Sequence, residues 1–364
     1  MTQTQRSIWL IGPFPPPLHG QAVYNAAIAD HLQQHGTLHI LATGSGPASK
    51  VLGYGRILWT ALFRIARTDI VYTSMPGQLA AWLFALVVAA LRLRGIRHFV
   101  HHHSYRSIAL GPLTIMRIVV WLGRHHQHHI LLSPVMRERF VALYLRGKSS
   151  QACTLSNAFL FCPAASVVVP RAPRPPTIGH LSVLSAEKGV DTLIQLFRQI
   201  AAVNPAIRLI LAGPVGDKRL YNLIDAASAD FPDRFEYRGP VTGEAKAHFY
   251  GEIDLFVLPT RLIDEAEPLV MLESYTAGVE FVGSNRGCIS ERLRRADCLL
   301  SDDVEQDSAL IVARLDEAAT DWSGFRQACA AHANRLHASA ASEAATLFAA
   351  MLTPADHAPF RKPA

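Results

Sequence analysis

The segment Leu258–Gly278 constrains this 364-residue chain more than any other stretch of its sequence. It carries two carboxylates eight residues apart, Glu265 and Glu273, and between them Pro268 opens an apolar run that a glycine closes. Proline is favoured in the first turn of a helix, where its missing N–H costs nothing, and glycine is favoured just past a helix end. The segment therefore predicts a helix from Pro268 to Ala277, with Glu265 in the preceding loop and Glu273 in the second turn.

The start of that helix favours an anionic ligand. Its free amides and the positive end of the helix dipole form a ready anion site. Acids on both sides suit a ligand with a phosphate in the middle and hydroxyls at both ends, and a nucleotide sugar has that form. For the glutamate pair alone, the alternative is a solvated acid on an amphipathic helix. Strand-like runs on either side, Asp254–Leu258 and Glu280–Gly283, favour the binding site.

Short apolar strands alternate with longer helical patterns throughout the chain, which predicts parallel α/β layers. The predicted strands are Ser7–Gly12, Leu38–Ala42, Ile70–Ser74, His98–His103, His129–Ser133, His180–Leu184, Arg208–Ala212, Phe235–Tyr237 and Asp254–Leu258. The predicted helices lie near Ala22–Gln34, Gln78–Leu93, Thr114–Gly123, Val135–Leu145, Val190–Ala202, Lys218–Ala229, Glu244–Tyr250 and Ser339–Met351. The proline-rich stretch Cys162–Pro176 is typical of an extended linker and divides this pattern into two halves.

The segment around the two glutamates resembles the donor-site motif of the retaining GT-B glycosyltransferases, the large group 1 family. In that family a Glu, seven residues and a second Glu are followed by Ala-Gly-x-Pro-Val. Here the second half ends in AGVEF, so Glu280 stands where the family has Pro. The resemblance covers nearly the whole chain and is strongest over residues 178–295.

The resemblance implies an α/β chain of the GT-B fold, with two doubly wound Rossmann-like domains and the active site in the interdomain cleft. It implies an acceptor-side domain over residues 1–165, a Pro-rich linker over 166–177 and a nucleotide-sugar-binding domain over 178–338. A C-terminal helix and tail over 339–364 would pack on the first domain. Transfer would retain the anomeric configuration, use a UDP-, GDP- or similar nucleotide sugar as donor, and need no metal and no further cofactor.

The same resemblance assigns roles to residues of the second domain. Glu273 would hold the ribose hydroxyls of the donor, and Glu265 would hold the hydroxyls of its sugar. Lys188, which stands before a glycine at a helix start, would bind the leaving diphosphate together with the backbone amides that open the Leu269 helix. The predicted donor-binding residues of this domain are Lys188, Glu265, Pro268, Leu269, Val270 and Glu273, and Lys188 and Glu265 are also predicted to be catalytic.

One element of the family is missing from this chain. Most members carry a Gly-Arg pair five residues before the lysine, and that Arg contacts the same diphosphate. Here the pair is Ser182 and Val183. Either another group replaces the Arg, such as Arg261 or backbone amides, or the activity is weakened.

Two further candidates lie in the first domain. Gly20 ends a proline-stiffened loop after the first strand, where a glycine lets backbone approach a ligand closely; a rigid surface loop is the alternative. In the family, a His at a strand end lies near the transferred sugar, and we predict His103 for that catalytic role, with His101 on the same strand face as the other option. Metal binding is the competing hypothesis, because histidines cluster at 101–103 and again at 125–129. No acid accompanies either cluster.

Charge is divided unevenly along the chain. Residues 1–150 hold 15 Lys and Arg against three acids, a net of +12, whereas the remainder holds 20 bases and 26 acids. A basic half predicts an anionic partner. The bases cluster around apolar helices without the aromatic interleaving of a base-stacking surface, which argues against nucleic acid and favours an anionic membrane face. Ordinary solvated arginines are the alternative for any single residue.

Five scattered cysteines without paired spacing predict free thiols in a reducing compartment. The N-terminus lacks the pattern of a signal peptide. The longest uncharged apolar stretch, Leu79–Leu91, has 13 residues, whereas a membrane span needs about 20. We therefore expect a cytoplasmic protein, peripheral at the inner face of the membrane.

The predicted function is sugar transfer from a nucleotide-diphosphate donor to a glycan or lipid-linked acceptor, in bacterial surface polysaccharide assembly. Two rivals stay open: a nucleotide-sugar epimerase of the same architecture, and a non-catalytic nucleotide-sugar binder, which the missing Arg at Val183 motivates. The donor sugar, its base, the acceptor and the linkage also stay open at this level.

Overall fold

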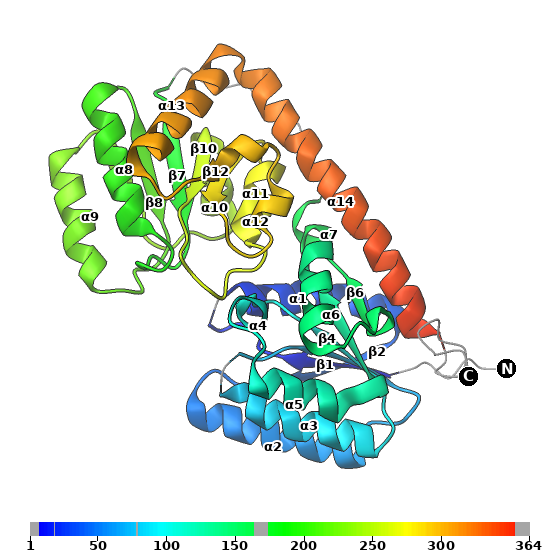
Figure 1. Cartoon of the computed structure of the whole chain (residues 1–364). Coiled ribbons are helices and arrows are strands. Elements are labelled where there is room, and N and C mark those ends of the chain that lie inside the picture. The colour runs from blue at the N-terminus through cyan, green and yellow to red at the C-terminus, as the bar shows by residue number, and fades with distance from the viewer. Residues whose placement is uncertain (1–6, 18, 78, 164–173, 354–364) are drawn as a thin grey trace. The chain divides into compact units, whose positions relative to one another are not determined.

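The computed structural model describes residues 7–17, 19–77, 79–163 and 174–353. The chain forms two compact units (Figure 1): residues 1–160 and 340–364 make unit 1, and residues 161–339 make unit 2. Most of the predicted linker 166–177 and the predicted tail lie outside the described residues.

Unit 1 is built on a six-stranded parallel sheet with the order β2-β1-β3-β4-β5-β6. Its strands are β1 (Ser7–Gly12), β2 (Thr37–Ala42), β3 (Ile70–Ser74), β4 (His98–His101), β5 (Gln127–Leu131) and β6 (Ala152–Thr154). Its helices are α1 (Gly20–Leu32), α2 (Pro47–Phe63), α3 (Ala80–Leu93), α4 (Arg106–Ala109), α5 (Thr114–Gly123) and α6 (Pro134–Tyr144), and the short α7 (Ala158–Phe161) crosses the boundary between the units.

Helices cover both faces of this sheet. The helices α2, α3 and α5 lie side by side on one face, and α1 and α6 lie on the other (Figure 1). Local sequence explains where they start: His19 Nδ1 accepts a hydrogen bond from the Ala22 amide and caps α1, and Ser133 caps α6 with Pro134 in its first turn. Strands such as β3 are buried along their whole length, as expected where a parallel sheet is covered twice.

Unit 2 repeats the plan with a second six-stranded parallel sheet in the order β12-β11-β10-β7-β8-β9. Its strands are β7 (Thr177–Leu181), β8 (Arg208–Ala212), β9 (Phe235–Tyr237), β10 (Leu255–Leu258), β11 (Glu280–Ser284) and β12 (Leu299–Leu300). Its helices are α8 (Val190–Val203), α9 (Arg219–Asp230), α10 (Gly243–Glu252), α11 (Leu269–Thr276), α12 (Ile289–Arg292) and α13 (Val304–Thr320).

The core of unit 2 follows from strand alternation. Leu255 and Val257 of β10 point into one apolar layer with α8, α9 and α13, while Phe256 between them points to the opposite face. There its ring stacks on Phe281 of β11, with centroids 5.7 Å apart. The sheet is thus held from both sides, and the loops at its carboxyl edge rest on a rigid base.

The last helix, α14 (Trp322–Leu352), belongs to both units, because its residues up to Ser339 fall in unit 2 and those from Ala340 in unit 1. In unit 1, Glu343 accepts a hydrogen bond from the Ser156 amide, and Phe348 packs on His31. Among the described residues, no helix is both long enough and apolar enough to cross a bilayer.

The predicted pair of doubly wound α/β domains is confirmed, with differences in detail. β4 ends at His101, two residues before the predicted end. β5 begins at Gln127, two residues before the predicted start, and its first residues are polar but buried, so a search for apolar residues misses them. β7 begins at Thr177, three residues before the predicted start, and its first amide donates to the Asp254 carboxylate at 3.0 Å. The sequence patterns also missed α2, in which Gly53 lies against the backbone of Thr43 and so allows a close helix approach. The polar α13 and the three-residue β6 were missed too, and α14 starts 17 residues earlier than predicted.

Candidate functional site

The strand order of unit 2 places a topological switch point between β7 and β10. From β7 the chain proceeds outward through β8 and β9, and from β10 it proceeds the other way through β11 and β12. In open α/β sheets, ligands bind outside the carboxyl ends of the strands at such a point. The loops that follow the two strands, residues 182–189 and 259–268, therefore border the expected crevice.

Lys188 lies near the end of the first loop, two residues before α8 begins at Val190. Gly189 follows it with φ of +76°, and a Cβ at that position would lie 1.8 Å from the carbonyl oxygen of Pro259 in the second loop. Only glycine fits there. The two loops are also joined by the Arg261 amide, which donates to the Glu187 carbonyl at 2.7 Å. Backbone packing thus holds Lys188 beside the loop that carries Glu265.

The two residues predicted to be catalytic in this unit are in direct contact. Lys188 Nζ lies 2.6 Å from Oε2 of Glu265, and Thr260 Oγ1 lies 3.4 Å from the same oxygen. The Glu265 side chain is 8% exposed and the Lys188 side chain 22%. A mostly buried ion pair at the switch point offers both a cation for a phosphate and a carboxylate for hydroxyl groups.

Glu273 lies in the second turn of α11, as predicted, and two side chains of α10 hold its carboxylate. Lys246 Nζ lies 2.5 Å from Oε1, and the Tyr250 hydroxyl donates to Oε2 at 3.0 Å. Burial, together with the Glu273 carboxylate, raises the pKa of Tyr250 well above its usual value, so the phenol remains a donor. The carboxylate is therefore fixed in orientation, as a group that binds paired hydroxyls must be.

The helix between the two glutamates starts one residue later than predicted. Pro268 is the extended N-cap, with ψ of 125°, and Leu269 and Val270 supply the first-turn amides, which have no acceptor inside the helix. The loop before this helix packs closely on Gly287, since a Cβ at position 287 would lie 2.4 Å from the Glu265 carbonyl oxygen. These amides point from a rigid element at the same sheet edge as Lys188.

The position of the missing Arg is occupied by Val183, whose side chain is 47% exposed. Arg261, one suggested replacement, binds both carboxylate oxygens of Asp191 at 2.8 Å and the Thr192 hydroxyl at 2.7 Å. Its guanidinium is therefore engaged at the start of α8. The first-turn amides of α11 and the Lys188 ammonium, which is paired with Glu265, are the candidate groups of this edge for a diphosphate.

Burial and local hydrogen bonds distinguish His180, a histidine at the same edge that sequence reasoning missed. Its Nδ1 lies 2.8 Å from the Val257 carbonyl oxygen and its Nε2 lies 2.8 Å from Ser182 Oγ. Burial lowers the pKa of His180 to about 4, and the Lys188 cation adds to this effect. The neutral ring joins β7 to β10 beneath the loops. Lys246 and Tyr250 were missed as well, although their spacing of four residues on one helix face was a usable signal.

In unit 1 the switch point lies between β1 and β3. Gly20, the first residue of α1, is exposed, and no atom lies within 4 Å of a Cβ built on it. His103 follows the carboxyl end of β4, and its ring lies 4.4 Å from Tyr24 and 4.1 Å from His101. Burial lowers the pKa of His103 to about 3, so the ring is neutral. His101 is fully buried, and its Nδ1 lies 2.6 Å from the Tyr72 hydroxyl.

Other histidines of unit 1 contact one another in the core. His102 Nε2 lies 3.0 Å from His129 Nδ1, and both rings pack on Phe140. In the described part of the chain, no three His, Cys, Asp or Glu side chains are grouped so as to hold a metal ion. The structure thus brings Lys188 and Glu265 together, places Glu273 and the α11 amides at the same sheet edge, and places Gly20 and His103 at the corresponding edge of unit 1.

Comparisons with known proteins agree with this geometry. Residues 165–335 match the family model of glycosyl transferases group 1. A GDP-mannose-dependent monoacylated alpha-(1-6)-phosphatidylinositol monomannoside mannosyltransferase of Corynebacterium glutamicum is 26% identical over 172 residues, which are 45% of this chain and 43% of that protein. A lipopolysaccharide 1,2-N-acetylglucosaminetransferase of Salmonella typhimurium is 30% identical over 115 residues, 30% of each chain.

The chain spans less than half the length of both curated relatives. Among solved structures, the crystal structure of Anabaena HepE in complex with UDP-glucose superposes with a TM-score of 0.70 at 17% identity, and the match covers 94% of this chain and 99% of that one. Such a match establishes the GT-B fold that the sequence predicted. Residues 165–335 thus match the group 1 glycosyl transferases, and the chain as a whole has the GT-B fold.

Proposed function

We propose that the chain is a glycosyltransferase that moves a sugar from a nucleotide-diphosphate donor to a glycan or lipid-linked acceptor, with retention of the anomeric configuration. The observation that carries this proposal is the Lys188–Glu265 ion pair at the switch point of the second sheet, at the edge where α11 begins. No metal and no cofactor beyond the donor is part of the proposal.

The site can stabilise a leaving diphosphate. As the bond between the sugar and the diphosphate breaks, negative charge grows on the phosphate oxygens. The Lys188 ammonium and the amides of Leu269 and Val270 are preorganised donors of the type that stabilises such charge. Because the usual Arg is absent at Val183, Lys188 carries a larger share of this work.

The ion pair also suggests an exchange of partners. When a diphosphate enters, it competes with Glu265 for the Lys188 ammonium. The freed carboxylate then accepts hydrogen bonds from hydroxyls of the donor sugar, while Thr260 stays within reach of it. Binding of the complete donor thus satisfies both charges, whereas a bare nucleoside diphosphate leaves Glu265 without its cation.

Glu273 is proposed to bind the ribose. Two adjacent ribose hydroxyls can donate to a carboxylate whose orientation Lys246 and Tyr250 already fix. This arrangement lowers the entropic cost of binding, since the side chain is ordered before the ligand arrives.

The names of the relatives support a nucleotide-sugar donor, but they differ in the sugar and in the nucleotide. The Corynebacterium relative is named for GDP-mannose, the Salmonella relative for N-acetylglucosamine transfer to lipopolysaccharide, and HepE holds UDP-glucose. Two of these names include a lipid acceptor. We therefore propose a lipid-linked or surface glycan as acceptor, and a cytoplasmic chain peripheral at the inner face of the membrane. His103 and Gly20 keep their predicted roles near the sugar and at the ligand loop.

One assay separates this proposal from its two rivals. The chain is incubated with UDP-, GDP- and ADP-sugars, with and without lipid-linked acceptors, and nucleoside diphosphate release is measured together with the configuration of the product. A transferase releases nucleoside diphosphate in proportion to the acceptor glycosylated, with retention. An epimerase changes the donor without any acceptor, and a binder releases nothing; either result would overturn the proposal.

A further inference from the structure

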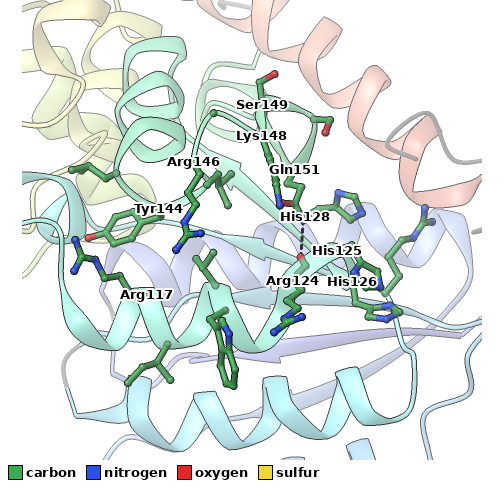
Figure 2. A pocket seen from close by; sticks show the side chains of 18 of the residues that line it. Arg117, Arg124, His125, His126, His128, Tyr144, Arg146, Lys148, Ser149 and Gln151 are labelled. Carbon is green, nitrogen blue, oxygen red and sulfur yellow. Dashed lines mark hydrogen bonds between the residues drawn. The ribbon is translucent and has the colours of Figure 1, made fainter. Parts of the chain in front are cut away.

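Unit 1 contains a basic pocket that the proposed reaction does not use. It has a volume of about 1790 Å³ and lies among α5, the loop after α6 and the residues that precede four strands (Figure 2). Arg67, Arg97, His126 and Gln151 stand just before β3, β4, β5 and β6 respectively. Because these strands are parallel, the pocket lies at their amino ends, whereas His103 lies beyond the carboxyl end of β4. It is therefore distinct from the edge where the acceptor side of the site is expected.

The pocket concentrates positive charge. Six of its lining residues are cationic, Arg67, Arg97, Arg117, Arg124, Arg146 and Lys148, and no acid lines it among the residues that the structure describes. Arg146 and Lys148 extend from the loop after α6 toward α5, which carries Arg117 and is followed directly by Arg124 (Figure 2). Burial lowers the pKa of His128 to about 4, and the Arg97 cation contributes to that shift.

The cations of this pocket differ from those of unit 2 in their partners. In unit 2, arginines such as Arg174 and Arg294 bind buried carboxylates, Asp254 and Glu280. Within the described residues, Arg117, Arg124, Arg146 and Lys148 have no carboxylate at ion-pair distance. Uncompensated cations gathered in one hollow favour an anionic partner from outside the chain.

An exposed apolar face adjoins the pocket. The helices α2, α3 and α5 lie side by side (Figure 1), and they expose large apolar side chains to solvent. The exposed fractions are 52% for Trp59, 66% for Phe63, 51% for Trp82, 56% for Leu86 and 59% for Trp121. Trp121 also lines the pocket, and the Arg124 guanidinium lies 5.5 Å from its ring centroid. Exposed tryptophans beside cations are typical of surfaces that meet the interface of a lipid bilayer.

We propose that the pocket and this apolar face together dock the chain on an anionic lipid bilayer, with phosphate head groups against Arg117, Arg124, Arg146 and Lys148 and with Trp59, Trp82 and Trp121 at the interface. The inference rests on the membrane location in the proposed function and names the surface responsible for it. Charge complementarity selects the bilayer as occupant, since Trp121 lines the pocket beside Arg124 and the Arg64 guanidinium lies 6.0 Å from the ring centroid of the exposed Trp59.

The test is flotation of the full chain with vesicles of neutral phosphatidylcholine and of phosphatidylcholine with anionic phosphatidylglycerol. Wild type is expected to bind the anionic vesicles at low salt, to be released by high salt, and to show a blue shift of tryptophan fluorescence. The double variant R117Q/K148Q should bind about 30-fold more weakly, at about fivefold for each basic residue near the surface. The matched control R198Q/R219Q removes two exposed arginines of unit 2 and should bind like wild type.

Several outcomes would overturn the inference. They are equal binding to neutral and anionic vesicles, no binding at low salt, and an equal loss in both double variants. Two others point to a different occupant: inorganic phosphate bound by wild type but not by R117Q/K148Q with no vesicle binding, and a salt-sensitive dimer in light scattering that the same variant abolishes.

Donor binding is measured by calorimetry on the same samples. Vesicle docking without any nucleotide binding would leave the surface in place and reject the glycosyltransferase proposal. Nucleotide binding without vesicle docking would reject the docking surface and leave the glycosyltransferase proposal in place.

Discussion

Lys188 Nζ lies 2.6 Å from Oε2 of Glu265, so the lysine that follows β7 and the glutamate that follows β10 are each other's partner. Both side chains are mostly buried, and the loops that carry them are joined through Gly189 and the Glu187 carbonyl. The contact therefore belongs to the fold of unit 2, and a ligand that takes one partner must satisfy the other.

We expect Lys188→Ala to lower turnover by about 10²-fold, with a smaller rise in the Michaelis constant for the donor. The reason is that the diphosphate gains charge in the transition state, where its cation matters most. Steady-state kinetics with the donor varied measures the two effects separately. Arg198→Ala, which breaks an exposed ion pair with Asp230, is the control. Turnover close to wild type in Lys188→Ala would show that another group stabilises the leaving diphosphate.

The exchange of partners predicts opposite effects for Glu265→Gln. The amide keeps the shape of the side chain but competes less for the Lys188 ammonium, because it carries no negative charge. We expect a bare nucleoside diphosphate to bind more tightly by roughly 1 kcal/mol, because the competing hydrogen bond to Lys188 loses its charge assistance. Sugar transfer should fall at the same time. Calorimetry and kinetics on one preparation test this, with Glu317→Gln as a surface control. Weaker diphosphate binding in Glu265→Gln would contradict the exchange.

Glu273→Ala should weaken nucleoside diphosphate binding by about 1–3 kcal/mol, the cost of a charge-assisted hydrogen bond. The effect should be absent for inorganic pyrophosphate, which has no ribose. Tyr250→Phe removes one hydrogen bond to Glu273 and keeps the carboxylate, so its effect should be smaller. Calorimetry with both ligands checks the assignment. Unchanged affinity for every nucleoside diphosphate would reject the ribose role.

The buried histidines predict acid sensitivity of folding. Burial lowers the pKa of His98 and His102 to about 3 in the folded chain, below an unfolded value of about 6.5. As pH falls below 6.5, the unfolded chain takes up protons first, so stability is complete above that pH and is lost toward pH 3. Each such histidine removes about 1.4 kcal/mol per pH unit in this window.

Chemical denaturation between pH 7.5 and 5.0 measures this slope. His98→Leu should make it shallower by about 1.4 kcal/mol per pH unit below 6.5, whereas the same denaturation series on His125→Gln, an exposed position, should match wild type. An unchanged slope in His98→Leu would show that this ring does not titrate as its burial implies.

Patterns in the sequence predicted the elements that local chemistry specifies. β3, β8 and β9 have the predicted bounds, and α11 differs by one residue at each end, because Pro268 takes the extended N-cap position and Ala277 the C-cap. Helix α2 was missed because Gly53 and Gly55 weaken its pattern, and the reason for Gly53 lies in tertiary packing against Thr43. The length of α14 also depends on packing, since the helix contributes to both units.

The sequence predicted the residues of the candidate site but not the contacts between them. A family motif pointed to Lys188 and Glu265, but their mutual contact depends on which strands are neighbours, and no local pattern contains that information. Glu280, where the family has Pro, pairs with Arg294 across the start of β11, and its carboxylate is fully buried. This pair explains how the departure from the family pattern is accommodated.

The most direct test of the account is a crystal structure of the chain with a nucleoside diphosphate bound. We predict diphosphate oxygens within hydrogen-bond distance of Lys188 Nζ and of the Leu269 and Val270 amides, ribose hydroxyls on Glu273, and a Glu265 carboxylate that has left Lys188. A diphosphate bound away from the start of α11, with the Lys188–Glu265 pair intact, would contradict the central claim.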